Sequence, residues 1–224
     1  MQQQSDSIRI KAIASRNGLT TLVFSGGCLC IFLLWLKIKD GPVFIAEYFL
    51  LLVFGIGVLL GFLKVREPDF SFELTEDSLS HFHKYGRWQI AWENIQRVDI
   101  PTIMKGFERQ DLSYIGIKLK VVEPFLDKLA PRLAVRMVME QQALFVQLLK
   151  TEAEPDVDHS DHIFNISDFR SASGKIYYGT SAMYAHRMML FRKLTGFDIL
   201  LPVSSIDREP RQFVELLRNH MHRV

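Results

Sequence analysis

The longest apolar runs lie close to the N-terminus. Residues 19–36 contain no charged side chain, and residues 43–63 contain a single charged side chain, that of Glu47. At about 1.5 Å per residue, a helix over the first run extends roughly 27 Å, close to the roughly 30 Å of a bilayer's hydrocarbon core. The short segment between the runs leaves no room for a domain. The pattern predicts a transmembrane hairpin over residues 19–63, preceded by a tail over residues 1–18.

Lys and Arg residues flank the two spans unequally. Five lie before the first span or after the second (Arg9, Lys11, Arg16, Lys64 and Arg66), and two lie between the spans (Lys37 and Lys39). Basic residues are enriched in cytoplasmic flanks. The sequence therefore predicts a multi-pass protein of the inner (plasma) membrane with both termini and the soluble domain in the cytoplasm.

A cleaved lipoprotein signal is an alternative interpretation, because small residues precede Cys28. Two observations disfavour it: Ser25 stands where such signals carry a large aliphatic residue, and the apolar run continues beyond Cys28. In the second span, Gly57 and Gly61 form a small-xxx-small pattern that allows close helix packing. The pattern fits packing inside the hairpin, and the alternative is a homodimer interface.

Residues 67–224 carry the patterns of a mixed α+β domain. Alternating apolar and polar positions and turn residues predict strands, which fall at residues 70–74, 79–85, 88–92, 95–100 and 112–122. The polar stretch 102–111 is predicted to be a loop.

The pattern then changes to helical spacing. Residues 123–150 are predicted to form a helical insertion, with a short helix at 123–130 and an amphipathic helix at 131–149. An acidic loop is expected at 151–161 and a short strand at 162–166.

The C-terminal part is predicted to contain a hairpin of strands at 185–194 and 197–201. We expect Asp207 to cap a last helix, whose buried face would consist of Phe213, Leu216, Leu217 and His220. A one-sided apolar helix must bury that face, so this helix is expected to cover an open corner of the sheet.

The charge balance narrows the functional classes. From Lys64 onward the chain has 22 Lys and Arg residues and 22 Asp and Glu residues. A neutral domain disfavours nucleic acid, which requires a basic face to neutralise phosphates. The two cysteines, Cys28 and Cys30, both lie in the first apolar run, so the soluble part has no disulfide framework.

Few residues suggest chemistry. The common nucleotide-binding, hydrolase and zinc motifs are missing from the sequence, and no catalytic residue or cofactor is predicted. His81 and His83 lie two apart on a predicted strand, so they face the same side and could hold a metal; the alternative is an ordinary strand. A second polar cluster, which could also hold a metal, comprises Asp156, Asp158, His159, Asp161 and His162. The alternative interpretation of this cluster is a solvated acidic loop.

Two basic segments are candidate binding surfaces for lipid or a partner. Lys84 and Arg87 flank a predicted turn, and basic residues are attracted to anionic membranes. Arg187, Arg192 and Lys193 lie in a Met-rich and aromatic segment. The plain alternatives are an exposed turn and a core strand with solvated charges.

Two stretches carry a family resemblance. Residues 72–79 read FELTEDSL and residues 88–98 read WQIAWENIQRV. They resemble bacterial pleckstrin-homology-like domains, which often follow two membrane spans with an "LT-x-x-x-L" turn and an "I-P-W-x-x-I-x-x-V" phrase. Ala91 stands where proline is often found, and residues 197–218 are similar to the family's last strand and capping helix. The resemblance implies a partly open antiparallel sheet or barrel capped by a helix.

The resemblance also implies binding or scaffolding rather than catalysis. Together with the predicted hairpin, it favours a membrane-anchored binding or scaffold module. Two alternatives stay open: an accessory subunit of a membrane protein complex, and a membrane-associated metal-dependent enzyme. The bilayer and either a membrane protein or a second copy of the chain are the expected partners.

Overall fold

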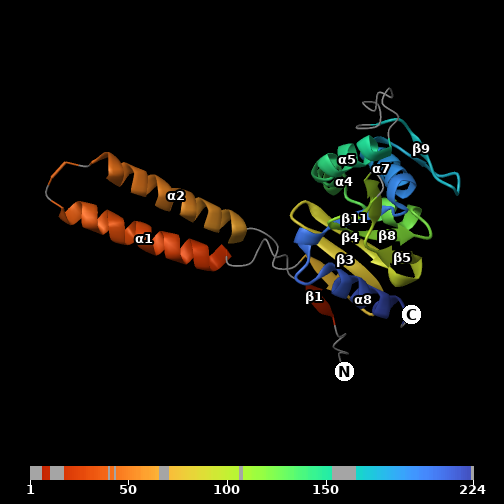
Figure 1. Ribbon diagram of the computed structural model, residues 1–224, viewed down its shortest axis with the longest axis horizontal. Helices are drawn as coiled ribbons and strands as arrows, with labels where there is room; N and C mark the ends of the chain where they lie inside the picture. Colours follow the sequence, from red (N-terminus) through yellow and green to blue (C-terminus); the bar gives the residue numbers. More distant parts are fainter. Residues whose placement is uncertain are drawn as a thin grey trace. The chain divides into compact units, whose positions relative to one another are not determined.

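The computed structural model describes most of the chain (Figure 1). The described residues are 7–10, 18–39, 41–42, 44–65, 71–105, 108–152 and 165–222. The chain forms two compact units. One comprises residues 11–69, and the other combines residues 1–10 with residues 70–224.

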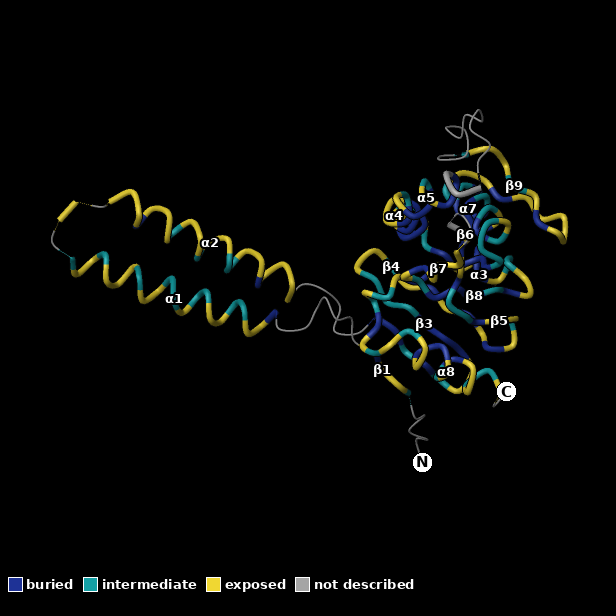
Figure 2. The backbone as a smooth tube through the Cα atoms, viewed as in Figure 1, coloured by how far each residue is buried: buried dark blue, intermediate teal, exposed yellow. Residues whose placement is uncertain are grey.

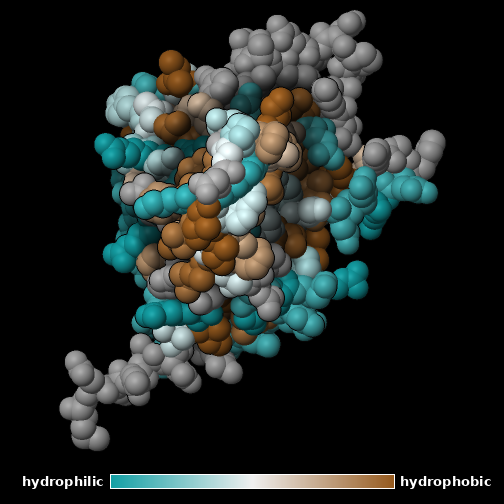
Figure 3. All heavy atoms as spheres, turned by 90° about the vertical axis from the view of Figure 1, so that its left-hand side faces the viewer, coloured by the Kyte–Doolittle hydropathy of each residue, from teal (hydrophilic) through white to brown (hydrophobic). Residues whose placement is uncertain are grey.

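The smaller unit is a hairpin of helices α1 (Gly18–Ile38) and α2 (Ile45–Val65). Both are long and apolar enough to cross a membrane, and their large apolar side chains are mostly exposed (Figure 2). Figure 3, which looks from the left-hand side of Figure 1, shows hydrophobic side chains gathered near the middle of the view. At the end where the helices are joined, Glu47 forms an ion pair with Lys39 and accepts a hydrogen bond from the Phe44 N–H (2.7 Å).

Small residues allow α1 and α2 to approach closely. A Cβ atom on Gly57 would lie 2.5 Å from the Ser25 Oγ, and one on Gly61 would lie 2.7 Å from backbone atoms of Leu22. Both distances are too short for a real side chain. Gly57 and Gly61 therefore face α1 inside the hairpin.

The first sheet of the larger unit is a four-stranded antiparallel meander. Its strands, in both chain and spatial order, are β1 (Ile8–Ile10), β2 (Phe72–Leu74), β3 (Ser78–His83) and β4 (Gly86–Ala91). β1 lies within the expected N-terminal tail, yet it pairs with β2 and buries Ile10 completely. The helical hairpin is therefore an insertion between the first two strands of this sheet.

The second sheet has three antiparallel strands in the order β11 (Ile199–Pro202), β8 (Tyr114–Leu119) and β5 (Ile95–Asp99). A 3₁₀ turn, η2 (Trp92–Asn94), connects β4 to β5. The expected loop at 102–111 is instead a hairpin of β6 (Thr102–Lys105) and β7 (Glu108–Asp111). This expectation was wrong because one buried residue, Ile103, packs the hairpin while its other strand is polar throughout.

Between β8 and β11 lies the helical insertion. It contains α3 (Glu123–Lys128), α4 (Pro131–Glu140), α5 (Gln142–Glu152), the short strands β9 (Phe169–Arg170) and β10 (Ile176–Tyr177), and α7 (Gly179–Thr195). The single helix expected at 131–149 breaks at Gln141, whose side-chain amide donates to the Leu200 carbonyl of β11 (2.8 Å). The expected acidic loop, apart from its first two residues, and most of the expected strand at 162–166 lie outside the described residues.

Helix α7 corrects the prediction of a strand at 185–194. The helix ends at Gly196, which adopts a left-handed conformation (φ 81°) and donates to the Arg192 carbonyl as a C-cap. Thr195-Gly196 is thus a helix end rather than a hairpin turn. Because α4, α5, β9 and β11 all contact α7, it is apolar on several sides and lacks the single stripe that marks an amphipathic helix.

The C-terminal helix α8 (Pro210–Met221) follows η3 (Val203–Ser205) and packs on both sheets. Phe213 and Leu217 are completely buried, and the Phe213 ring lies 5.7 Å from the Phe72 ring of β2. The predicted cap is corrected: Glu209, not Asp207, occupies the N-cap position, and Pro210 takes the first helical position.

Candidate functional site

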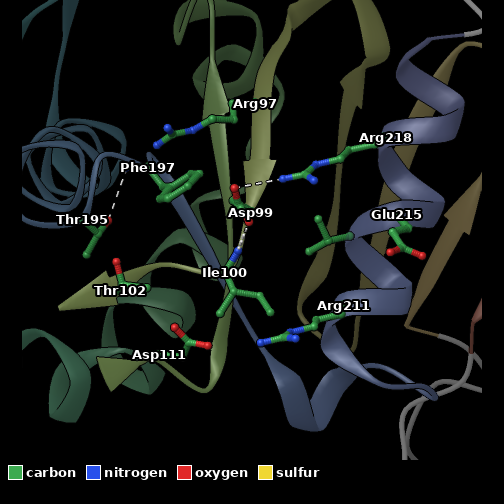
Figure 4. Close-up of a pocket in the computed structure, with 11 residues that line it drawn as sticks. Arg97, Asp99, Ile100, Thr102, Asp111, Thr195, Phe197, Arg211, Glu215 and Arg218 are labelled. Carbon is green, nitrogen blue, oxygen red and sulfur yellow. Dashed lines mark hydrogen bonds and ion pairs between the residues drawn. The ribbon is translucent and has the colours of Figure 1, made fainter. Parts of the chain in front are cut away.

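A cleft of about 470 Å³ opens beside strand β5 (Figure 4). Its walls come from β5, the β6–β7 hairpin, the end of α7 and helix α8. The lining residues are Arg97, Asp99, Ile100, Thr102, Asp111, Thr195, Phe197, Arg211, Val214, Glu215 and Arg218. Segments separated by more than a hundred residues thus meet at one site.

Helix α8 supplies one wall because its two faces differ. Arg211, Val214, Glu215 and Arg218 recur at three- and four-residue spacing and therefore lie on one side of the helix. Phe213 and Leu217 are buried in the core. Burial of the apolar face holds the polar face against the edge of β5.

The outer edge of β5 is satisfied by side chains. No strand pairs with this edge in the part of the chain that the structure describes. Instead, the Arg218 Nε donates to the Val98 carbonyl (3.1 Å), and the Asp99 carboxylate accepts from the Ile100 N–H (3.0 Å). Arg218 and Asp99 also form an ion pair (2.9 Å). Two side chains thus occupy positions that a neighbouring strand would take in a longer sheet.

The cleft is electrically balanced, because its lining has three arginines and three carboxylates. The Arg97 guanidinium lies 4.5 Å from the centre of the Phe197 ring. Asp111 and Arg211 point into the cleft from opposite sides (Figure 4). The hydroxyl of Thr195 donates to the Phe191 carbonyl (2.7 Å), so it is held by the backbone. This lining suits a ligand with polar groups of both signs.

The predicted basic turn is exposed at the β3–β4 connection. Lys84 lies 5.1 Å from the centre of the Tyr85 ring, and Arg136 of α4 lies 5.8 Å from it. Gly86 has a φ of 145°, and a Cβ there would lie 3.2 Å from the Ala130 Cβ. The turn is therefore held closely against the start of α4.

In the second predicted basic surface, helix α7 directs the three cations differently. Arg187 is buried, with its guanidinium 3.6 Å from the centre of the Phe145 ring, and burial lowers the pKa of Arg187 to about 10. Arg192 forms two hydrogen bonds to the buried Asp198 (2.6 and 2.7 Å). Only Lys193 is exposed without a structural contact of this kind.

Asp198 has a structural role at the centre of this arrangement. Its carboxylate accepts from the Leu119 N–H (2.8 Å), while Arg192 donates to the Leu119 carbonyl (2.9 Å). The pair therefore ties the end of α7 to β8. Arg192 therefore has a fold-stabilising role, while its side chain stays 40% exposed.

His81 and His83 do face the same side of β3, with ring centres 6.2 Å apart. His81 stacks on Trp88 (5.2 Å) and contacts Phe72 (4.7 Å). Burial, with a smaller effect of His83, lowers the pKa of His81 to about 3. Within the described residues, no three His, Cys, Asp or Glu side chains gather as metal ligands. The cluster of Asp156, Asp158, His159, Asp161 and His162 lies outside those residues.

Comparison with known protein families gives a match over most of the larger unit. The family described as "Protein of unknown function (DUF2982)" covers residues 72–223. The chain belongs to the DUF2982 family. The DUF2982 region begins at β2 and ends after α8, so it includes the cleft but excludes β1 and the hairpin. Searches of curated proteins and of solved structures found no match to the chain.

Proposed function

We propose that this DUF2982 protein is a multi-pass protein of the inner (plasma) membrane with a cytoplasmic binding domain. The connectivity supports this topology. β1 precedes the hairpin and β2 follows it, and the two strands pair, so both flanks of the hairpin must lie on one side of a membrane. That side carries the five basic flanking residues, as cytoplasmic flanks do.

Reporter fusions test the topology. A cytoplasm-active reporter is expected to work after residue 224 and to fail at residue 40, between the spans. An alkaline phosphatase active only outside the cytoplasm should give the opposite pattern. Phosphatase activity at residue 224 would overturn the proposed orientation.

We also propose that the domain is pleckstrin-homology-like. The strand order supports this: four strands form a meander, three more form a second meander, and an amphipathic helix follows. In this view, the membrane hairpin occupies the first strand connection. The helical segment α3–α7 occupies the last connection between strands, from β8 to β11.

The binding function proposed for the cleft is to hold an extended segment of a partner protein along β5. The observation that carries the proposal is the β5 edge, where Val98 and Ile100 are bonded by side chains instead of a strand. An extended peptide can add to such an edge through main-chain hydrogen bonds. The charges of both signs around the cleft would then contact alternate side chains of the peptide.

Formation of the proposed complex displaces two side-chain hydrogen bonds at the edge of β5. The incoming strand replaces the Arg218 bond to the Val98 carbonyl and the Asp99 bond to the Ile100 N–H. Because both side chains are partly exposed, they can move aside without opening the core. An accessory subunit of a membrane complex would use the same edge to hold its neighbour.

Site-specific photocrosslinking tests this function in native membranes. A photoreactive phenylalanine analogue at Thr102, inside the cleft, is expected to form one dominant crosslinked product. The same analogue at Glu76, an exposed turn residue, serves as the control. Arg211→Glu, which reverses a charge in the lining, should weaken the Thr102 product. Equal products at both sites, or none at Thr102, would exclude the cleft.

A further inference from the structure

The register of the first sheet determines which of its turns lies at the end where β1 ends and β2 begins. Ile10 pairs with Phe72, Phe72 with His81, and His81 with Trp88. Ile10 is the last residue of β1 and Phe72 the first of β2. The two segments that connect this sheet to helices α1 and α2 therefore both leave the sheet at the end where Ile10 pairs with Phe72. β3 continues from His81 to His83 and then turns. The β3–β4 turn therefore lies at the sheet end from which the chain leads to the membrane helices.

The two ends of the sheet have opposite charge. At the hairpin end lie Lys84 of the β3–β4 connection and Arg87, the second residue of β4, both exposed. At the other end, the β2–β3 connection presents Glu76 and Asp77, also exposed. An anionic bilayer attracts the first end and repels the second. The charge pattern thus agrees with the connectivity.

Helix α4 enlarges the basic end. Arg136 lies beside the Tyr85 ring, and Arg132 lies one turn earlier on the same face of the helix. Glu140 is the acidic residue that contacts this group, through an ion pair with Arg136 (2.7 Å). Tyr85 is 42% exposed between the cations. A ring with a polar tip is a side-chain type that settles at membrane interfaces.

We propose that Lys84, Tyr85, Arg87, Arg132 and Arg136 form a face that contacts anionic lipid head groups of the bilayer that the hairpin spans. This inference rests on the proposed membrane insertion. The face holds the domain against the bilayer, with Tyr85 at the level of the head groups. Each Lys or Arg at an anionic surface strengthens attraction about fivefold. Four cations against one carboxylate therefore suffice to orient a domain that is already tethered.

The test uses the full-length protein in nanodiscs, with Cys28 and Cys30 replaced by serine. A spin label is attached either at Lys84→Cys or, as the matched control, at Glu76→Cys in the opposite turn. Nanodiscs contain phosphatidylcholine alone or with about 30% phosphatidylglycerol. Accessibility to a water-soluble nickel relaxant is expected to fall at least about twofold at position 84 when the anionic lipid is present. Position 76 should not change.

Charge-reversal variants and added phosphate distinguish contact with anionic lipid from binding of free phosphate. Arg87→Glu with Arg136→Glu should abolish the lipid effect, whereas Lys193→Glu, an exposed cation on α7, should preserve it. Inorganic phosphate added to phosphatidylcholine discs should change nothing; an equal effect of phosphate would overturn the lipid assignment. The absence of any lipid effect would also overturn it.

Failure of membrane insertion is detected separately. Alkaline carbonate should leave the protein in the membrane fraction if the hairpin spans the bilayer. Extraction by carbonate would refute the proposed insertion itself. Retention combined with unchanged accessibility at position 84 would refute only the lipid-contacting face.

Discussion

Docking of helix α8 yields a quantitative prediction. Leu217 is completely buried in the main core, so Leu217→Ala removes apolar contacts and leaves a cavity. Such substitutions cost about 2–5 kcal/mol, against a typical domain stability of about 5–15 kcal/mol. For a domain of this size, about 2–4 °C is lost per kcal/mol. We therefore expect the melting temperature to fall by roughly 4–20 °C.

Arg218→Ala provides an intermediate case. Sequence spacing alone suggests that Arg218 faces water and that its loss has no effect. Arg218 is indeed exposed, but it also bonds the Val98 carbonyl and pairs with Asp99, so its loss should have an effect. Losing that hydrogen bond costs about 0.5–1.5 kcal/mol, and the exposed ion pair adds about 0–1 kcal/mol. Gln212→Ala, at an exposed position of the same helix, should cost almost nothing.

The assay is thermal unfolding of the full-length protein in detergent, followed by tryptophan fluorescence. Trp92 is a suitable reporter, because its ring lies 5.5 Å from His220 of α8. The loss of melting temperature is expected to increase from Gln212→Ala through Arg218→Ala to Leu217→Ala. Leu217→Met should stay close to wild type because it keeps the side-chain volume. Equal melting temperatures for Leu217→Ala and Gln212→Ala would show that α8 is not docked on the sheets.

Three further predictions concern the core. Residues 71–222 alone should unfold without cooperativity, and rejoining residues 7–10 through a short Gly-Ser linker should restore a cooperative transition; a stable fragment without them would refute the role of β1. His81 has a pKa of about 3 when folded and 6.5 in its ordinary state, so stability should fall from pH 6.5 towards pH 3 by up to about 1.4 kcal/mol per unit. His81→Phe should flatten that slope in denaturant titrations, and an unchanged slope would contradict it. Arg192→Ala leaves Asp198 buried without its cation and should cost about 3–5 kcal/mol, while Ala at the exposed neighbour Lys193 should leave the denaturation midpoint unchanged.

Local patterns predicted much of the fold. The apolar runs located both hairpin helices, and short apolar segments bounded by turn residues located the strands from β2 to β5; burial alternates along β2 and β4. Phe213 and Leu217 were recognised from helical spacing. In all these elements, the type of element follows from a pattern of neighbouring residues in the sequence.

The errors have a different physical origin. Helix α7 is buried on several sides, so its sequence shows no single stripe, and Arg187 is covered by Phe145 from another helix. β1 contains only three residues, and its role depends on pairing with β2 beyond the hairpin. The cleft was not predicted because Arg97 and Asp111 read as ordinary solvated positions. The one local signal was the charged face of α8 at three- and four-residue spacing.

The position of β1 determines the order of events during synthesis. β1 leaves the ribosome before the hairpin, yet its partner residues lie 62 to 66 positions later, from the Ile10–Phe72 pair to the Ile8–Leu74 pair. A chain emerging at about 5–20 residues per second thus completes both hydrophobic segments before β1 meets β2. The first sheet therefore closes only after both segments have been synthesised. In the proposed topology, a hairpin inserted with its ends on opposite sides would keep β1 from β2, so pairing of the two strands requires both ends to lie on one side of the bilayer.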